Sequence, residues 1–491
     1  MSEPAPTRWS RADSIAVLVV VLAAAGLRLV SLGRPVDLVF DEIFYARDAC
    51  WYVLGTDTAC GITELTSRAH PPLGKWLIGA GIAVFGYDAF GWRVTAAVAG
   101  IASVGMVYLV ARRLLHGTIG RAATVGAITA SILLATDFLH LVQSRIAMLD
   151  AFITLFVIGA VTFAVLDRDR RAPDVDAPWW WSLTLGRPWR LAAGVALGAA
   201  VATKWSGAYV APAVIGLVAA WEIASAKRVT PQQDLRMAIR SAFRREAIPT
   251  LVTLGMVPVL VYLASYIGRM PGAIVALPWE AGSVWRGIWD HQQAMLDFHT
   301  TLGGDHPYQS PPLAWPALQR PVAYWFSEQN GSYREILALG NPFAWWPGLV
   351  AVAVLGLTWW RARWAVGRPE PVIVLAALST YLPWIVLSGG RSQTFLWYFL
   401  PTVPFLALAL GTLAAWGWRR TRWRVATAVY GLVIAVSFGF WLPVLTALPQ
   451  APDAWRTRIL FTDCDRPDGS RPTLPDDSSS SGAPPGGWCW I

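Results

Sequence analysis

The sequence has 491 residues, of which 55% are hydrophobic and only 14% are charged. Average soluble domains carry about 25% charged residues, so the composition excludes an ordinary soluble enzyme and is typical of a membrane protein. The 29 Trp residues suit a chain with two long membrane interfaces, where an indole ring keeps its N–H near water. The net charge of +9 is compatible with nucleic-acid binding only if the basic residues do not simply follow the membrane topology.

Apolar stretches long enough to cross a hydrocarbon core of about 30 Å recur along the chain. The first one lacks a small-residue cleavage site and is expected to be a retained span rather than a cleaved signal. The fifth and sixth form one apolar run interrupted by "TKWSG", and we expect two spans that meet there at a tight turn. In all, we predict an all-α polytopic protein with about eleven spans, at residues 14–33, 91–111, 121–138, 147–166, 189–203, 207–224, 248–266, 343–360, 372–388, 395–416 and 425–446.

The distribution of basic residues predicts the orientation. An odd number of spans places the two termini on opposite sides. With the N-terminus inside, 23 of the 40 Lys and Arg residues fall in short inner segments, 16 fall in the longer outer segments, and Arg28 lies within the first span. The positive-inside rule therefore favours a cytoplasmic N-terminus and an outer C-terminus. It also accounts for the net charge without any nucleic acid.

The outer side then receives three long segments, at 34–90, 267–342 and 447–491. We divide the chain into a transmembrane domain, 1–446, and an outer tail, 447–491, whose Pro/Gly/Ser-rich part is expected to be partly disordered. In the first outer loop, "WLIGAGIAVFG" is too short to span and is expected to form an amphipathic helix at the membrane surface. All four cysteines are predicted outside, where disulfides are permitted, and pairing by proximity would join Cys50 to Cys60 and Cys464 to Cys489.

Ionisable residues gather at the outer ends of the predicted spans. An ionisable side chain at membrane depth is costly, so each is a candidate for function. Each also has a structural alternative: an Arg can extend its charge toward headgroups, Arg145 and Asp150 can tie two helices together, and an acidic pair can favour a helix N-terminus. The candidates are Asp41, Glu42, His70, Lys75, Arg93, Arg145, Asp150, Lys204 and Arg391.

A lipid-linked phosphate, with its headgroup at the interface, would suit this arrangement. Arg93, Arg145 and Lys204 would hold the phosphate, and Lys75 and Asp150 would support them. A phosphate leaves readily when cations stabilise its charge, so the reaction needs one carboxylate, as a base, and no acid. The second carboxylate of the pair is then free to orient the acceptor.

Several motifs together resemble the protein O-mannosyltransferase family. They are "VFDEIFYARDACWYV", "HPPLGKWLIGAGIAVFGYDAFGWRV", "QSRIAMLDAFITLF", "ATKWSGAY", "HTTLGGDHPYQSPPLAWPALQRPVAYWF" and "ALGNPFAWW", in an order that covers residues 36 to 415. The resemblance implies a GT-C-type inverting glycosyltransferase. Such enzymes transfer mannose from a polyprenyl-phosphate carrier to Ser or Thr hydroxyls of exported proteins.

The resemblance also implies roles for single residues. Asp41 matches the general base, Glu42 would help to position the acceptor, and Arg93, Arg145 and Lys204 match basic positions of the motifs. His70 is then a candidate contact of the donor sugar or phosphate, or else a residue that fixes the following Pro-Pro turn. Independently of the resemblance, the position of Arg391 at the outer end of a predicted span makes it a further candidate phosphate ligand.

The second large outer loop is too short for the soluble β-trefoil module that eukaryotic members carry there. The chain therefore resembles a bacterial member of the plasma membrane. We expect its partners to be the lipid donor, membrane lipids, and unfolded Ser/Thr-rich polypeptides emerging from a secretion channel.

Two other functions share these features. One is a transferase that passes the sugar to a glycolipid, and the other is a non-enzymatic lipid or lipid-sugar transporter. Transporters usually carry polar residues near the midplane and an internal repeat, and neither is apparent here. Asp41, Glu42, Asp150 and Asp305 have the oxygen ligands for a divalent cation, but nearby Arg and Lys already balance their charge, so we expect no metal or other cofactor.

Overall fold

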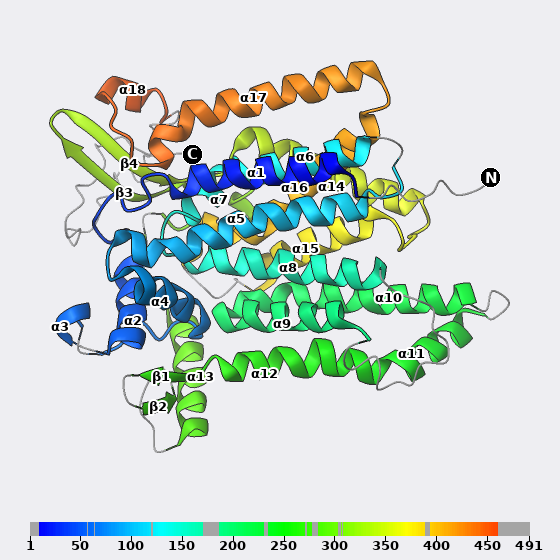
Figure 1. The fold of residues 1–491 in the computed structure, drawn as a ribbon, viewed down its shortest axis with the longest axis horizontal. Helices are drawn as coiled ribbons and strands as arrows, with labels where there is room; N and C mark the ends of the chain where they lie inside the picture. Colours follow the sequence, from blue (N-terminus) through cyan, green and yellow to red (C-terminus); the bar gives the residue numbers. More distant parts are fainter. Residues whose placement is uncertain are drawn as a thin grey trace.

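The structure is a computed structural model. It describes residues 9–55, 57–62, 64–118, 121–169, 186–229, 234–270, 273–276, 283–302, 306, 308–387 and 393–459. Long helices run roughly parallel to one another along one axis of the molecule (Figure 1).

Each of the eleven predicted spans coincides with one helix or with two or three consecutive helical elements. Within the described residues, nine helical segments are long and apolar enough to cross a membrane, whereas α6 and α9, with 14 and 16 residues, are shorter. The helices are α1 (Arg11–Leu29), α5 (Ala89–Leu114), α6 (Ala122–Ala135), α8 (Leu149–Asp169), α9 (Pro188–Thr203), α10 (Ala211–Val229), α11 (Leu235–Leu251) continued by η3 (Val252–Met256) and α12 (Val257–Ala264), α14 (Pro342–Arg361), α15 (Pro369–Leu387), α16 (Val403–Gly417) and α17 (Thr421–Leu445).

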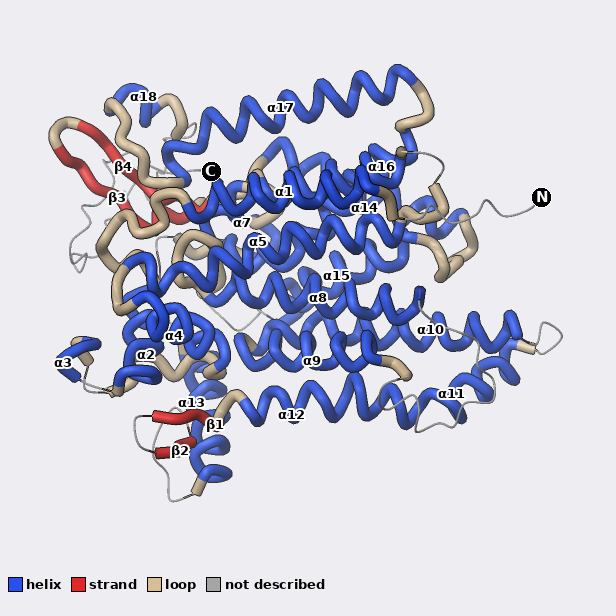
Figure 2. The backbone as a smooth tube through the Cα atoms, viewed as in Figure 1, coloured by secondary structure: helices blue, strands red, loops and turns tan. Residues whose placement is uncertain are grey.

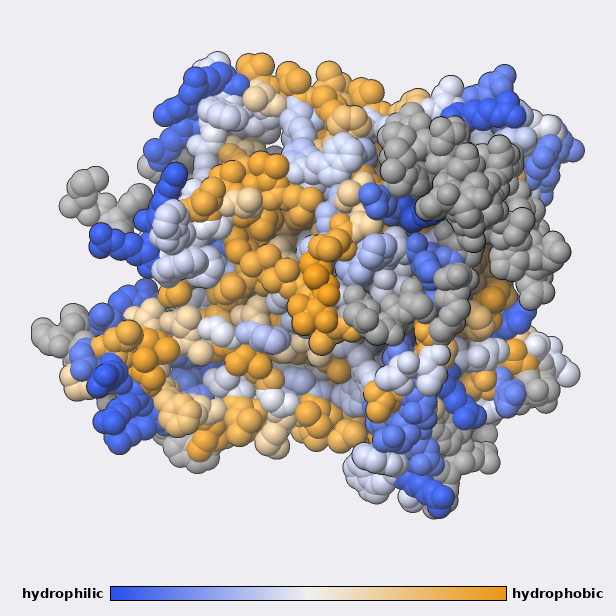
Figure 3. All heavy atoms as spheres, turned by 180° about the vertical axis from the view of Figure 1, so that it is seen from behind, coloured by the Kyte–Doolittle hydropathy of each residue, from blue (hydrophilic) through white to orange (hydrophobic). Residues whose placement is uncertain are grey.

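The surface supports a membrane location. Hydrophobic residues form a broad area across the middle of the molecule, and hydrophilic residues lie mainly toward its two ends (Figure 3). Exposed apolar side chains on the outer helices, such as Leu22, Val259 and Val436, fit a lipid environment because water would penalise them.

The remaining short elements gather at one end of the bundle, which we call the loop end (Figure 2). They are α2 (Glu42–Leu54), α3 (Asp57–Cys60), α4 (Leu73–Phe85), α7 (Phe138–Gln143), η2 (Trp205–Val210), α13 (Val284–Thr301), η4 (Pro312–Ala314), η5 (Leu396–Thr402), α18 (Pro452–Arg456) and four strands. α4 forms where an amphipathic helix was predicted, and it packs against both α2 and α5 with Ile78 and Ile82 buried.

The loop end also contains two short β-hairpins, which add to the helical fold that was predicted. β1 (Ile267–Met270) pairs with β2 (Ala273–Ala276), and β3 (Val322–Gln329) pairs with β4 (Ser332–Ala338), both antiparallel. The β3–β4 hairpin turns at Asn330 and Gly331, whose φ angles are 51° and 72°. Two positive φ angles at an Asn-Gly pair are the signature of a two-residue hairpin turn, so this signal was present in the sequence.

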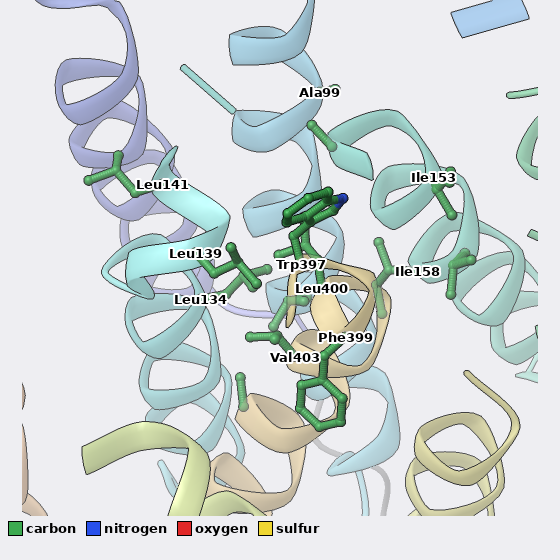
Figure 4. Packing of buried hydrophobic residues seen from close by; sticks show 14 of the residues in the cluster. Ala99, Leu134, Leu139, Leu141, Ile153, Ile158, Trp397, Phe399, Leu400 and Val403 are labelled. Atoms are coloured by element: carbon green, nitrogen blue, oxygen red, sulfur yellow. The ribbon is translucent and has the colours of Figure 1, made fainter. Parts of the chain in front are cut away.

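The core below the loop end is organised around η5. Trp397, Phe399 and Leu400 of η5 are buried, with Leu134 and Leu139 on one side and Ile153 and Ile158 on the other (Figure 4). This aromatic insertion fixes the ends of α6 and α8, and Asp150 lies in the first turn of α8.

Two glycines allow α9 to approach its neighbours closely. A Cβ atom added at Gly194 would lie 1.8 Å from the backbone oxygen of Thr253, and one added at Gly198 would lie 2.7 Å from that of Pro258. Small residues spaced four apart permit such close packing between membrane helices. The packing positions the end of α9, where the chain turns at Lys204 into η2, as the "TKWSG" interruption predicted.

The predicted Cys50–Cys60 disulfide is confirmed, with an S–S distance of 2.00 Å. Cys464 and Cys489 lie outside the described residues. The beginning of the C-terminal tail is ordered against the β3–β4 hairpin, because Trp455 packs on Phe326 and Tyr333. The predicted disorder of the tail concerns residues beyond 459, which are not described.

Candidate active site

Asp41 lies at the end of the connection between α1 and α2, directly before α2 begins. The preceding residue, Phe40, has a φ of 50° and packs on Tyr324 and Trp397, with ring centroids 4.5 and 5.2 Å apart. Asp41 is the N-cap of α2, yet its side chain does not cap the helix. Its carboxylate instead accepts a hydrogen bond from the hydroxyl of Tyr45, one helical turn later. Asp41 and Glu42 do lie at the N-terminus of α2, where the helix dipole favours acidic residues, so this alternative holds for their position, but the carboxylate of Asp41 does not cap the helix.

Asp150 and Lys204 lie beside Asp41. The Nζ atom of Lys204 is 3.2 Å from both carboxylate oxygens of Asp150 and 4.2 Å from the ring centroid of Tyr398. Both charges are buried and close enough to Asp41 to influence its titration. α8, α9 and η5 thus bring three residues from distant parts of the sequence together with the start of α2.

The surroundings of Asp41 raise its pKa. Asp41 retains some accessible surface, but protein atoms surround its carboxyl group. Burial raises the pKa of Asp41 to about 6, Lys204 opposes the change, and the negative charge of Asp150 adds to it. A carboxyl group with this pKa is ionised at neutral pH and is a stronger base than an exposed Asp, as general base catalysis requires.

Glu42 has a different environment, because all of its hydrogen-bonding capacity is used within the protein. Its Oε1 atom accepts from Nε of Arg93 and the backbone N–H of Ala147, each at 2.8 Å. Its Oε2 atom accepts from Nη2 of Arg93 at 2.7 Å and from the backbone N–H of Val39 at 2.8 Å. Both Glu42 and Arg93 are completely buried. This geometry argues against the acceptor-positioning role predicted for Glu42.

The same geometry argues against a phosphate-binding role for Arg93. Besides its two bonds to Glu42, Arg93 donates to the backbone oxygens of Leu32, Pro35 and Asp37. A guanidinium group has five N–H bonds, and these contacts use all five. Arg93 therefore fixes the chain before Asp41 rather than holding a ligand.

Arg145 also contacts backbone oxygens. Its Nη1 atom lies 2.8, 3.1 and 2.9 Å from the carbonyl oxygens of Leu27, Arg28 and Val30. These carbonyls end α1 and have no partner within the helix, so the cation stabilises the helix C-terminus. The structural alternative in which Arg145 pairs with Asp150 is not realised, since Asp150 pairs with Lys204.

Lys75 belongs to the scaffold of the first outer loop. Its Nζ atom is 2.7 Å from Asp48 of α2 and 2.5 Å from the backbone oxygen of Ser67. Asp48 in turn accepts from the backbone N–H and hydroxyl of Thr66. The buried Lys75–Asp48 ion pair thus holds residues 66–67 against α2. Lys75 supports the helix that follows Asp41 and does not contact Asp41 itself.

His70 lies close to this site, next to the Pro-Pro turn that begins α4. Its ring centroid is 6.1 Å from that of Tyr45 and 5.5 Å from that of His299. His299 and His291 of α13 reach the backbone oxygens of Ala69 and Arg68. Contacts from α13 therefore hold the loop that carries His70. The His70 ring lies beside Tyr45, which contacts Asp41. Arg391 lies outside the described residues.

Three tyrosines were missed by the sequence analysis. Tyr45 contacts Asp41, Tyr324 of β3 is buried close to Asp41 and Asp150, and the ring of Tyr398 of η5 is buried against the ammonium group of Lys204. Gln143 donates to the hydroxyl of Tyr324 at 2.6 Å. Helical spacing from Asp41 was enough to suggest Tyr45. No local signal marks the other two, because they arrive from remote segments.

Comparison with known families gives two matches that together cover most of the chain. Residues 18–269 match the model of the dolichyl-phosphate-mannose-protein mannosyltransferases, and residues 284–463 match the C-terminal four-transmembrane region of protein O-mannosyltransferases. The chain belongs to this family. The resemblance noted in the motifs is thereby confirmed.

Bacterial members of the mannosyltransferase family are similar over nearly their whole length. A polyprenol-phosphate-mannose–protein mannosyltransferase of Mycobacterium tuberculosis is 31% identical, with 90% of each chain covered. The corresponding protein of Mycolicibacterium smegmatis is 31% identical over 91% of this chain and 92% of that protein.

Solved structures agree on the fold. One chain of the Saccharomyces cerevisiae protein O-mannosyltransferase Pmt1–Pmt2 complex superposes with a TM-score of 0.72 at 15% identity, covering 92% of both chains. ArnT from Cupriavidus metallidurans reaches a TM-score of 0.51 at 17% identity over 87% of this chain. The protein therefore has the GT-C fold that the motifs implied.

Proposed function

We propose that this mannosyltransferase moves mannose from polyprenyl-phosphate-mannose to Ser or Thr hydroxyls of exported proteins, with Asp41 as the general base. Family membership and the names of the bacterial relatives support the donor and the protein acceptor over the glycolipid-acceptor and transporter alternatives. The observation that carries the catalytic assignment is the contrast within the acidic pair. Asp41 has unused hydrogen-bonding capacity and a raised pKa, whereas Glu42 has no free acceptor.

The reaction is a single displacement. The acceptor hydroxyl oxygen attacks C1 of mannose while its proton passes to the carboxylate of Asp41. The bond between C1 and the phosphate oxygen breaks, and its electron pair leaves with the polyprenyl phosphate, which gains one negative charge. Attack opposite the leaving group inverts the configuration at C1, and no acid is needed because phosphate is a stable leaving group.

Lys204 is the described cation best placed for the leaving phosphate. Lys204 forms an ion pair with Asp150. An ammonium group has three N–H bonds and Asp150 offers two oxygens, so one N–H bond is left for the phosphate. Asp150 and Tyr398 hold Lys204 in place, so its charge is oriented before the phosphate charge develops. His70 and Arg391 remain proposed donor contacts, and for Arg391 the only support is its position in the sequence at the outer end of a predicted span.

We further propose a bacterial plasma-membrane protein whose loop end and C-terminus face the exterior. The excess of Lys and Arg in the short segments at the other end supports this orientation. Acceptors would be engaged unfolded as they leave a secretion channel, because a hydroxyl on a folded domain could not reach a carboxylate so enclosed. Presenting folded and unfolded forms of one acceptor to the purified enzyme tests this, and equal rates would contradict it.

The expectation of no metal cofactor stays a prediction. Within the residues that the structure describes, no group of three or more His, Cys, Asp or Glu side chains is arranged to hold a metal ion. Full activity in EDTA would support the prediction, and recovery of a lost activity by one added divalent ion would overturn it.

The function itself is tested by transfer of labelled mannose from polyprenyl-phosphate-mannose to a Ser/Thr-rich peptide or to a glycolipid. We expect label in the peptide alone, attached with the anomeric configuration opposite to that of the donor. Label in the lipid alone, or retention of configuration, would refute the proposal.

A further inference from the structure

A large pocket lies at the end of the bundle opposite the active site. Its volume is about 840 Å³, and it lies among the last turns of α5, α8 and α10 and the connection between α14 and α15. The length of α8 gives the distance between the pocket and the active site, because Asp150 is in the first turn of this helix and Arg168 is in its last. Eighteen residues of helix span about 27 Å, so this pocket is distinct from the catalytic centre.

The pocket is strongly basic. Arg112, Arg113, Arg168, Arg228 and His116 line it, and among the lining residues that the structure describes Asp169 is the one carboxylate. Two of the four arginines have acidic partners, since Arg112 pairs with Asp13 and Arg168 with Asp169. Arg113 and Arg228 form no ion pair with any residue that the structure describes. We call this set of residues the basic pocket.

Unsatisfied donors point to an anionic ligand. The Nε atom of Arg113 and the Nη1 atom of Arg168 are buried, and neither has a hydrogen-bond partner within the described part of the chain. A buried donor without a partner is costly, and the cost is greater for a charged group. A phosphate group placed between these arginines would supply the missing acceptors, because guanidinium groups bind phosphate oxygens in pairs.

Aromatic residues place the basic pocket at a membrane interface. The guanidinium carbon of Arg168 lies 5.2 Å from the ring centroid of Trp221, and Trp221 donates to the backbone oxygen of Val366 at 2.9 Å. Trp360 and Trp364, close to Val366 in the sequence, are exposed, as Trp residues are in interfacial belts. Basic pockets between membrane helices at this depth are suited to lipid headgroups.

We propose that the basic pocket binds the phosphate-bearing headgroup of an anionic membrane lipid, held between Arg113 and Arg168. The volume is large enough for a headgroup and part of its glycerol backbone. The bound lipid would join the ends of α5, α8 and α10 through its phosphate. This site is separate from the donor site and does not depend on the proposed reaction.

Native mass spectrometry of the full-length protein in detergent tests the site. Phosphatidylglycerol is titrated against phosphatidylcholine for the wild type, for Arg113→Gln/Arg168→Gln, and for Arg422→Gln, an exposed arginine outside the pocket with no ion pair among the described residues. We expect the wild type to prefer phosphatidylglycerol, the double variant to bind it about tenfold more weakly or less, and Arg422→Gln to match the wild type. Equal binding by the double variant would overturn the proposal.

A second variant covers the case in which the double variant does not fold. Arg228→Gln changes an exposed side chain of the same pocket and should weaken phosphatidylglycerol binding about threefold, with wild-type binding counting against the proposal. Competition with glycerol 3-phosphate separates the two sources of phosphate. Failure to displace the lipid at millimolar concentration supports a lipid site, whereas binding as tight as that of the lipid would assign the pocket to a soluble phosphate compound and overturn the lipid assignment.

Discussion

Asp41 and Glu42 are neighbours in the sequence, yet their carboxylates lie in two different regions of the molecule. Glu42 accepts four hydrogen bonds. Two come from Arg93 of α5, one from Val39 in the chain before α2, and one from Ala147 in the segment before α8. Asp41 accepts from Tyr45 and otherwise faces the Asp150–Lys204 pair. Both regions combine carboxylates with a cation. They differ in how much hydrogen-bonding capacity is left on the carboxylate of the acidic pair.

The difference separates scaffold from chemistry. A buried charge whose partners are complete cannot take a proton or a ligand without losing those partners. A buried carboxylate with spare capacity is costly to keep and is available to a substrate. By this criterion the Glu42–Arg93 region holds the backbone in place, and the Asp41–Asp150–Lys204 region does the chemistry.

The largest expected effect comes from Asp41→Asn. The amide keeps the shape but cannot accept a proton, so mannosyl transfer to a peptide should fall by about 10² to 10⁴-fold. The melting temperature in detergent should not fall, because the change removes a buried negative charge. Asp37→Asn in the same loop is the matched control and should keep its activity, since Asp37 contributes only its backbone oxygen to Arg93. Full activity of Asp41→Asn would assign the base to another residue.

Glu42→Gln should affect stability instead. It leaves the buried Arg93 without its anionic partner, and breaking a buried ion pair costs about 3 kcal/mol or more. Thermal unfolding measures the loss, and Arg93→Met in the same chain should restore part of it. A Glu42→Gln protein as stable as the wild type but inactive would show that Glu42 acts in catalysis and that the two regions are not distinct.

The pH dependence of the reaction should report on the Asp41 region. Asp41 must be ionised to accept a proton, so kcat/KM should rise with pH and level off above the raised pKa of about 6. Asp150→Asn removes a negative charge that raises the pKa of Asp41, so this limb should move to lower pH. Lys204→Met removes a charge that lowers the pKa, so the limb should move to higher pH. If neither variant shifts the rise of kcat/KM with pH, that rise does not report the ionisation of Asp41.

A separate pH effect, on stability alone, should appear at Glu335, a buried carboxylate of β4 that belongs to neither region. Its Oε2 atom accepts from Nε1 of Trp455 at 2.6 Å, and burial raises the pKa of Glu335 to about 8. The unfolded chain ionises this group near pH 4.5, so the stability of the fold should decrease as pH rises from about 4.5 to about 8 and then stay constant. Melting curves of the wild type and Glu335→Gln measure this, and the variant's relative stability should grow with pH over that interval. Parallel curves would contradict the assignment.

Much of the fold could be predicted because the signals are local. A membrane span needs an uninterrupted apolar run, and the eleven predicted runs all became helices. The Cys50–Cys60 pair was evident from proximity within one outer loop. The β3–β4 hairpin was equally local, but its Asn-Gly turn was overlooked in a chain dominated by helical signals.

The candidate site could be predicted only as a set of charges at one end of the spans. That an acidic pair and several cations meet at one end follows from the sequence alone, since the spans fix the depth of the residues that follow them. Folding in three dimensions determines that all five N–H bonds of Arg93 go to carboxylate and carbonyl oxygens, that Nη1 of Arg145 contacts the carbonyl oxygens at the end of α1, and that Lys204 lies near Asp41 and beside Asp150. The physical reason is that hydrogen-bonding partners are chosen by distance in space, and Glu42 finds its partners 51 and 105 residues further along the chain.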